Sequence, residues 1–217
     1  MARSTSGTLP SPEEAVASRF ALRDLDRFYR FHARVYDWTR PLLLFGRAQT
    51  ARALEARRGD LVLDVGCGTG VNLPGLLASG ASVVGIEPSA AMRARTEARA
   101  AALTDDLKQR LRLDPRPYGS HDDYAGRVTG VLFSYSLSMI PPFAEVLAQA
   151  RADLRPGGRL AIVDFLDATP MVARALEASH VHLGPARLLE IERLFPRHRT
   201  LVRRGPGWRY FRVIAEG

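Results

Sequence analysis

Apolar residues near the start of the chain recur at helical spacing. Phe28, Phe31 and Val35 lie three or four positions apart, which predicts an amphipathic helix that begins near residue 20. A proline interrupts the pattern, and a second helix is expected over about 42–58. The residues before the first helix, 1–19, are rich in Ser, Thr and Pro, so we expect a flexible tail there.

From residue 59 onward, apolar runs of strand length alternate with helical segments. The expected strands cover 61–65, 82–86, 110–113, 128–134 and 159–164, and the expected helices cover 72–78, 89–101, 143–154, 171–178 and 185–194. A hairpin is expected from 201–203 to 209–214, around Gly-Pro-Gly. The alternation predicts an α/β fold with a Rossmann-like doubly wound sheet, mostly parallel, with an antiparallel C-terminal edge strand. We expect one domain over 20–217, with a helical cap at 20–58 and the core at 59–217.

The first predicted strand leads into a glycine-rich loop within LDVGCGTGVN, residues 63–72. Its glycines follow the pattern GxGxG, with Val71 where a dinucleotide fingerprint would have glycine. Glycine lets a backbone turn tightly and approach a ligand closely. Glu87 ends the second strand about twenty residues later, where a carboxylate can grip ribose hydroxyls. We expect a nucleoside-containing cofactor here, with Asp64 orienting the amide groups of the loop.

The fourth predicted strand ends in an unusual polar stretch, FSYSLSMIPP at 133–142. Ser134, Tyr135 and Ser136 place hydroxyls at the carboxyl end of a buried strand, where parallel sheets bind ligands. We expect these hydroxyls to bond the polar end of the cofactor or to shape an acceptor site. The alternative is that they bond only to backbone at the strand end.

Three motifs together resemble the class I S-adenosylmethionine-dependent methyltransferases: DVGCGTG, the acid in GIEPSAAM, and LRPGGRLAIVDF. The resemblance implies that the loop contacts the methionine portion of S-adenosylmethionine, that Glu87 binds its ribose, and that Pro88 and Met92 pack against adenine. The cofactor-binding residues expected are Asp64, Gly66, Cys67, Gly68, Thr69, Gly70, Asn72, Glu87, Pro88, Met92, Ser134 and Tyr135. Three acids after the third strand remain open candidates for the adenine amine: Asp114, Asp122 and Asp123.

A closer resemblance is to the bacterial enzymes of betaine-lipid synthesis, which N-methylate diacylglyceryl homoserine. It rests on YRFHARVYDWTRPLLLFGR at 29–47, SYSLSMIPP at 134–142, His-Val at 180–181 and a late Gly-x-x-Tyr that ends at Tyr210. It implies N-methylation of a small-molecule or lipid-linked amino acid acceptor. The N-terminal helix is then expected to form a lid over the site.

Methyl transfer to an amine requires alignment of the nitrogen lone pair with the methyl group and exclusion of water, and no metal is expected. Aromatic rings would stabilise the quaternary product, and histidines could take the proton of the acceptor. The expected substrate-binding residues are Tyr29, His32, Tyr36, Met139, His180, His182 and Tyr210, and the expected catalytic residues are Tyr36, Tyr135 and Ser136.

Two alternatives remain open at this level. The same cofactor could be attacked at its aminocarboxypropyl carbon, by an acceptor or by its own amine, which would release methylthioadenosine. A protein that binds the cofactor without turning it over is the other alternative, against which the intact loop and Glu87 argue.

The excess of basic residues raises the question of whether the protein binds an anionic partner. The net charge is +8, and Lys108 is the only lysine among 31 basic residues. The arginines are scattered except over 193–212, which indicates a solvated surface, or contact with an anionic membrane surface or an acidic partner. No nucleic-acid partner is expected, because Ile140 stands where DNA amino-methyltransferases need a polar residue before the prolines. The single cysteine, Cys67, and the lack of a long apolar run favour a cytoplasmic protein.

Overall fold

The computed structural model describes residues 44–217. The tail expected over 1–19 and the helix expected after it lie outside these residues. So do three of the residues expected at the site, Tyr29, His32 and Tyr36.

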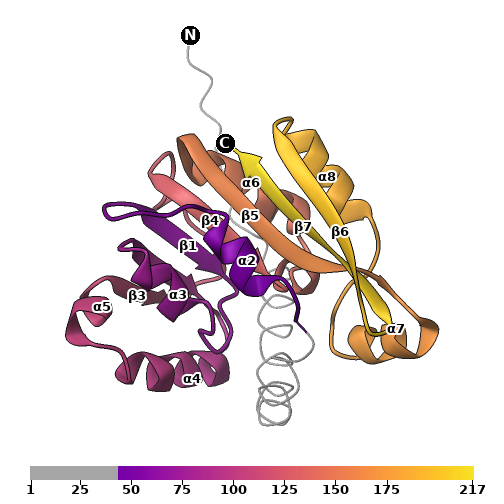
Figure 1. Cartoon of the computed structure of the whole chain (residues 1–217), viewed down its shortest axis with the longest axis horizontal. Coiled ribbons are helices and arrows are strands. Elements are labelled where there is room, and N and C mark those ends of the chain that lie inside the picture. Colours follow the sequence, from indigo (N-terminus) through magenta and orange to yellow (C-terminus); the bar gives the residue numbers. More distant parts are fainter. Residues whose placement is uncertain (1–43) are drawn as a thin grey trace, which may run out of the picture.

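Helices and strands alternate along the described chain (Figure 1). The strands are β1 (Leu61–Val65), β2 (Ser82–Ile86), β3 (Leu111–Asp114), β4 (Val128–Ser134), β5 (Leu154–Ala168), β6 (His198–Gly205) and β7 (Trp208–Glu216). The helices are α2 (Arg47–Arg52), α3 (Leu73–Ala78), α4 (Ala90–Ala101), α5 (Asp105–Gln109), α6 (Phe143–Asp153), α7 (Pro170–Glu177) and α8 (Ala186–Leu194), with a short 3-10 helix η1 (Leu137–Met139).

The strands of the described residues form one sheet in the order β3-β2-β1-β4-β5-β7-β6. The first five strands pair in parallel, and β7 is antiparallel to both β5 and β6. The prediction of a mostly parallel, doubly wound sheet is confirmed. The antiparallel C-terminal strand lies one place inside the edge, however. It carries the buried residues Phe211, Val213 and Ala215, whereas β6 is exposed along most of its length.

Two apolar layers enclose the sheet. On one face, α6 and α8 contribute Leu147 and Ile191 to a cluster that includes Phe133 of β4. On the other face, α3 contributes Leu77 to a cluster that includes Leu132. Because successive strand residues point to opposite faces, β4 is buried on both sides and its carboxyl end is held rigidly between the layers.

Several boundaries lie within one residue of the prediction, including those of β1, β2, β4, α4 and α6. The helix expected over 42–58 ends at Arg52, and Glu55 has a φ of 51° as the chain turns toward β1. The short α5 is not anticipated, because five residues are too few to show a helical period. No helix within residues 44–217 is both long and apolar enough to cross a membrane.

Candidate functional site

The glycine loop between β1 and α3 owes its shape to three left-handed glycines. Gly66, Gly68 and Gly70 have φ values of 66°, 60° and 73°, a conformation that side chains disfavour. A Cβ atom at Gly66 would lie 2.6 Å from Cβ of Ser136, and one at Gly70 would lie 2.8 Å from Cγ2 of Thr96. A Cβ atom at Gly68 would meet nothing within 4 Å. The outer two glycines therefore allow close packing, while Gly68 faces open space.

Two side chains of helix α4 hold this loop in place by hydrogen bonds. Thr96 donates its hydroxyl to the Gly68 carbonyl over 2.6 Å, and Arg99 Nε donates to the Thr69 carbonyl over 2.8 Å. Ser89 caps the helix by accepting a hydrogen bond from the Met92 amide. The carbonyls of the loop are thus turned toward α4.

The Glu87 carboxylate lies against the same loop. Its Oε2 accepts a hydrogen bond from the Gly68 amide over 3.0 Å, and its Oε1 accepts one from the Ser89 amide over 2.9 Å. Each carboxylate oxygen has two acceptor sites, so a carboxylate oxygen can accept a hydroxyl donor as well as an amide. The residue is 8% exposed, which places a nearly desolvated negative charge beside the open space at Gly68.

Asp64 does not do what the sequence predicted. It is fully buried, and its two oxygens accept hydrogen bonds of 3.4 Å from the Asn72 side chain. The loop amides bond elsewhere, since those of Gly66 and Cys67 both donate to the Ile86 carbonyl. The prediction that Asp64 orients the loop amides is therefore wrong.

Arg47, at the start of α2, lies close to this buried acid and was given no role by the sequence. Burial raises the pKa of the Asp64 carboxyl to about 7, and the Arg47 guanidinium opposes that rise. Arg47 Nε also donates to Ser134 Oγ over 3.2 Å. An arginine and a carboxylate thus lie together between the carboxyl ends of β1 and β4. The sequence did contain a signal for this residue, because Arg47 is the last residue of the segment 29–47 that resembles the betaine-lipid enzymes.

The polar end of β4 is largely satisfied by protein. Ser136 donates to the Val65 carbonyl over 2.6 Å, and Tyr135 donates to the Phe45 carbonyl over 2.8 Å. Both hydroxyls therefore donate to backbone in this structure, and their expected contact with a ligand stays a prediction. The alternative, bonding to backbone, describes both. Tyr135 has a φ of 58°, which is rare for a bulky residue and bends the chain sharply into η1.

An aromatic cluster lies beyond this bend. The rings of Tyr135 and Phe165 are 4.7 Å apart, and Phe45 stacks on Tyr210 at 6.4 Å with an angle of 19° between the planes. Trp208 contacts both Phe45 and Phe165. Of the predicted acceptor residues, Met139 and Tyr210 lie in or against this cluster, while His180 and His182 are exposed on either side of its buried Val181.

A buried acid at the end of β5 supports the bend. Asp164 accepts hydrogen bonds from the Ser138 and Phe165 amides over 2.7 and 2.8 Å. Burial raises the pKa of Asp164, and Arg187 of α8, itself 3% exposed, opposes that rise. Because each of its oxygens accepts a hydrogen bond from a backbone amide, Asp164 positions η1. Nothing in the sequence pairs Arg187 with it, because the two lie on separate elements.

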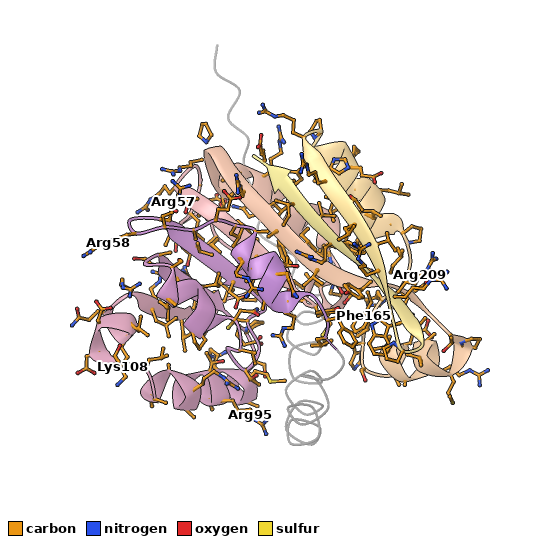
Figure 2. The ribbon with its side chains drawn as sticks, viewed as in Figure 1. Arg57, Arg58, Arg95, Lys108, Phe165 and Arg209 are labelled. Carbon is orange, nitrogen blue, oxygen red and sulfur yellow. The ribbon has the colours of Figure 1, made fainter. Side chains whose placement is uncertain are left out.

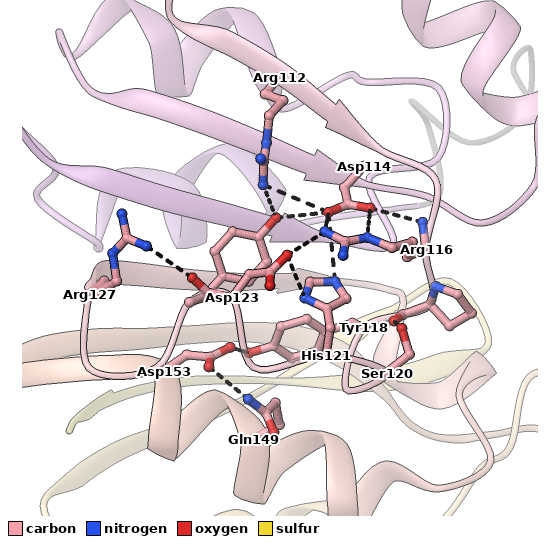
Figure 3. A network of polar contacts seen from close by, with 12 residues as sticks. Arg112, Asp114, Arg116, Tyr118, Ser120, His121, Asp123, Arg127, Gln149 and Asp153 are labelled. Atoms are coloured by element: carbon pink, nitrogen blue, oxygen red, sulfur yellow. Dashed lines mark hydrogen bonds and ion pairs between the residues drawn. The ribbon is translucent and has the colours of Figure 1, made fainter. Parts of the chain in front are cut away.

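Two of the three candidate acids, Asp114 and Asp123, belong to one network of polar contacts (Figure 3). Asp114 is buried at the strand end and accepts hydrogen bonds from Arg116 and from the Tyr124 hydroxyl, and the Arg116 guanidinium holds its pKa well below the usual range. Asp123 pairs with the same guanidinium over 2.7 Å, while Asp122 is exposed. Asp114 is therefore the acid placed beside Glu87, whose amide donates to the Asp114 carbonyl over 3.0 Å.

The remaining predicted cofactor residues differ in access. Pro88 is half-buried next to Glu87, and Thr69 is 9% exposed. Met92 is 2% exposed and packs inside, so its predicted contact with a ligand is not open in this structure. Burial raises the pKa of the Cys67 thiol, as expected for a packing residue. Groups of three or more residues able to hold a metal ion are absent from the described residues.

Sequence comparison identifies relatives of the chain. The family model described as the methyltransferase domain matches residues 36–216. A demethylmenaquinone methyltransferase of Beutenbergia cavernae is 34% identical over 138 residues, which cover 61% of this chain and 54% of the relative. One from Mycolicibacterium gilvum is 29% identical over 202 residues, covering 81% and 82%. The chain spans 54% to 62% of the length of the first three such relatives.

Solved structures share the fold at low identity. The 1,6-didemethyltoxoflavin-N1-methyltransferase of Burkholderia thailandensis, solved with its substrate and S-adenosylhomocysteine, is 22% identical with a TM-score of 0.66. The alignment covers 98% of this chain and 92% of that one. The names of the curated relatives differ from the betaine-lipid enzymes that the N-terminal segment resembles.

Proposed function

Because the chain belongs to the methyltransferase domain family, we propose that it transfers the methyl group of S-adenosylmethionine to a lipid-soluble acceptor. The observation that carries the proposal is the open space at Gly68, bordered by the desolvated carboxylate of Glu87. A nucleoside fits there, with its ribose hydroxyls donating to Glu87 and no side chain from position 68 in the way. Membership of the methyltransferase domain family agrees with the resemblance of the three sequence motifs to S-adenosylmethionine-dependent methyltransferases.

The methionine end of the cofactor would lie between β1 and β4. It carries an ammonium and a carboxylate, and the buried Asp64 and the half-buried Arg47 offer one opposite charge to each. Asn72 and Ser134 hold these two side chains through hydrogen bonds. This arrangement would fix the sulfonium at the carboxyl end of β4, so that its methyl group points toward the aromatic cluster.

Transfer itself is an in-line displacement. The bond between sulfur and the methyl carbon breaks as the acceptor atom forms a new bond to that carbon, and S-adenosylhomocysteine leaves with the electron pair on sulfur. The protein contributes alignment and exclusion of water, which are worth several orders of magnitude in rate. The bend at Tyr135 and the acid Asp164 that supports it would keep the acceptor side of the site rigid.

The first candidate acceptor is a demethylated quinone of the kind named for the curated relatives. Support comes from the aromatic cluster around Phe165, whose rings suit a flat apolar ring system. The second candidate is the amine of a homoserine lipid. Support for it comes from the same rings, since aromatic faces stabilise a quaternary ammonium by about 0.5–2 kcal/mol each.

The test offers both acceptors to the full chain. The protein is incubated with S-adenosylmethionine labelled in its methyl group, and with either reduced demethylmenaquinone or diacylglyceryl homoserine in detergent micelles. Mass spectrometry then identifies both products. Label in one lipid together with S-adenosylhomocysteine would support the proposal and choose the acceptor.

Two results would count against it. Methylthioadenosine in place of S-adenosylhomocysteine would move the reaction to the aminocarboxypropyl carbon. Failure to bind S-adenosylhomocysteine at all would remove the cofactor site, and the Glu87→Ala variant provides the matched baseline for that measurement.

A further inference from the structure

The edge strand β6 carries an uncompensated positive charge. Between Arg193 and Ala215 the sequence has seven arginines and no Asp or Glu. Three of them pair with acids from other parts of the chain, namely Arg193 with Glu190, Arg197 with Glu216 and Arg209 with Asp167. Arg212 bonds Thr50 instead. The other three, Arg199, Arg203 and Arg204, are exposed on β6 and form no ion pair with any residue of the part that the structure describes, although the charge of Arg204 helps to lower the pKa of Asp167.

Two aliphatic side chains lie between these arginines. Leu201 is 37% exposed and Val202 is 40% exposed, in the middle of a strand whose neighbours in sequence are all exposed. Because strand residues alternate, Leu201 points to one face of the sheet and Val202 to the other. We define Arg199, Leu201, Val202, Arg203 and Arg204 as the basic edge. It has an apolar centre with guanidinium groups at both ends.

We propose that the basic edge docks on a lipid bilayer that contains anionic lipids. Guanidinium groups would lie among the anionic headgroups, while Leu201 and Val202 would reach the boundary of the acyl chains. Nucleic acid would also attract the arginines, but its phosphates give the two aliphatic side chains nothing to contact. Charged residues on an edge strand can also serve only to prevent pairing between sheets. That role needs no contact partner, and the test below distinguishes it.

The position of the basic edge relative to the candidate site agrees with docking. The turn after β6 contacts the start of α7, where the Thr169 amide donates to the Gly207 carbonyl over 2.8 Å. Helix α7 lies at this end of the hairpin (Figure 1), and its Met171 is 80% exposed. This end of the hairpin also carries Trp208, a member of the aromatic cluster. A protein resting on its basic edge would therefore hold the aromatic cluster close to the bilayer, whatever acceptor it uses.

The experiment measures binding of the full chain to sedimenting vesicles, without any acceptor or cofactor. Vesicles of phosphatidylcholine alone are compared with vesicles that contain phosphatidylglycerol, at about 0.1 M salt. We expect binding only to the second kind. Each arginine near an anionic surface is worth about a fivefold change in affinity. The triple variant Arg199→Gln, Arg203→Gln, Arg204→Gln should therefore bind on the order of 100-fold more weakly.

A second triple variant removes the same charge elsewhere. Arg57, Arg58 and Lys108 lie on the side of the molecule away from β6 (Figure 2). Their replacement by Gln should leave vesicle binding within about twofold of the original protein, because charges beyond a Debye length are screened. Leu201→Ser with Val202→Ser should weaken binding while net charge stays the same. Circular dichroism checks that all three variants fold.

Several outcomes would overturn the proposal. Equal loss in the two triple variants would mean that net charge alone attracts the protein to vesicles. A second contrary result is that the first triple variant binds vesicles as the original protein does and also begins to self-associate. The arginines would then serve only to prevent pairing between sheet edges. Tight binding of a DNA duplex that the same variant abolishes, without vesicle binding, would identify nucleic acid as the partner.

Discussion

The carboxyl ends of β1 and β2 differ from those of β4 and β5 in what they leave open. At the first pair, a left-handed glycine exposes bare backbone beside the Glu87 carboxylate. At the second pair, the hydroxyls of Tyr135 and Ser136 are already bonded to carbonyls, and Asp164 is bonded to two amides. The first half is built to receive a polar ligand, and the second half is built to hold a rigid apolar wall.

This difference explains how well each half could be anticipated. The cofactor half depends on residues close together in sequence, and its glycines are required by backbone conformation alone. The acceptor half depends on contacts across 71 to 90 positions, such as Ser136 to Val65 and Tyr135 to Phe45. A hydroxyl that serves a ligand and a hydroxyl that serves a distant carbonyl look the same in sequence.

The largest effect is expected at Gly68. Gly68→Ala places a methyl group in space that the protein leaves empty, so we expect the affinity for S-adenosylhomocysteine to fall by at least 100-fold, or about 3 kcal/mol. The left-handed φ should also cost about 1–2 kcal/mol of unfolding free energy. Gly59→Ala is the matched control, because Gly59 has a φ of 89° and equally open surroundings away from the loop. It should show the stability loss alone, and equal affinity losses in both variants would contradict the site.

A smaller effect is expected from pH at Asp64. Its pKa of about 7 means that the carboxylate needed for an ammonium group forms as the pH rises through 7. Affinity for S-adenosylhomocysteine should therefore increase by up to about tenfold between pH 6 and pH 8, measured by calorimetry. Stability of the unliganded protein should change in the opposite direction. The folded state binds the proton more tightly than the unfolded chain does, so stability falls as the pH rises from about 4 to 7.

Asp64→Asn provides the control for both trends. The amide cannot ionise, so the dependence of affinity and of stability on pH should flatten across this range. A variant that keeps the full pH dependence of the original protein would show that another group is responsible.

The smallest effect is expected at the end of β4. Ser136→Ala and Tyr135→Phe each remove one hydrogen bond to a carbonyl, so each should lower the free energy of unfolding by about 1 kcal/mol, measured by urea denaturation. Cofactor affinity should stay within about twofold, because neither hydroxyl faces the space at Gly68. If either variant instead loses cofactor affinity with its stability intact, the end of β4 belongs to the cofactor site. The difference between the two halves of the site would then not hold.

The fold was predictable because its signals are periodic and local. Strands β1, β2 and β4 were predicted with the boundaries that the structure has, and the cap at Ser89 follows from a serine before a helical segment. The place of β7 inside the edge was not predictable, because pairing order depends on which strand buries more apolar surface. The sheet position follows from Phe211 and Val213, whose burial becomes visible only once the strands are assembled.

Within the site, the sequence located the loop and its acid but not the residues that support them. Arg47 bonds Ser134, which lies 87 positions away in the sequence, and Arg187 bonds Phe165, which lies 22 positions away. Long arginine side chains can reach many partners, so sequence position alone does not identify the one that is used. Met92 shows the converse, since its position after Glu87 suggested an exposed contact while its helix turns it inward.

The proposed cofactor site depends most directly on Glu87, and isothermal titration calorimetry with S-adenosylhomocysteine tests its role. Glu87→Ala removes the acceptor proposed for the ribose hydroxyls, so we expect binding to weaken by about 1.5–3 kcal/mol, or roughly 10- to 100-fold. Glu55→Ala, which removes an exposed carboxylate that pairs with Arg159, should bind as the original protein does. Binding by Glu87→Ala that equals binding by Glu55→Ala would contradict the assignment of the cofactor to the ends of β1 and β2.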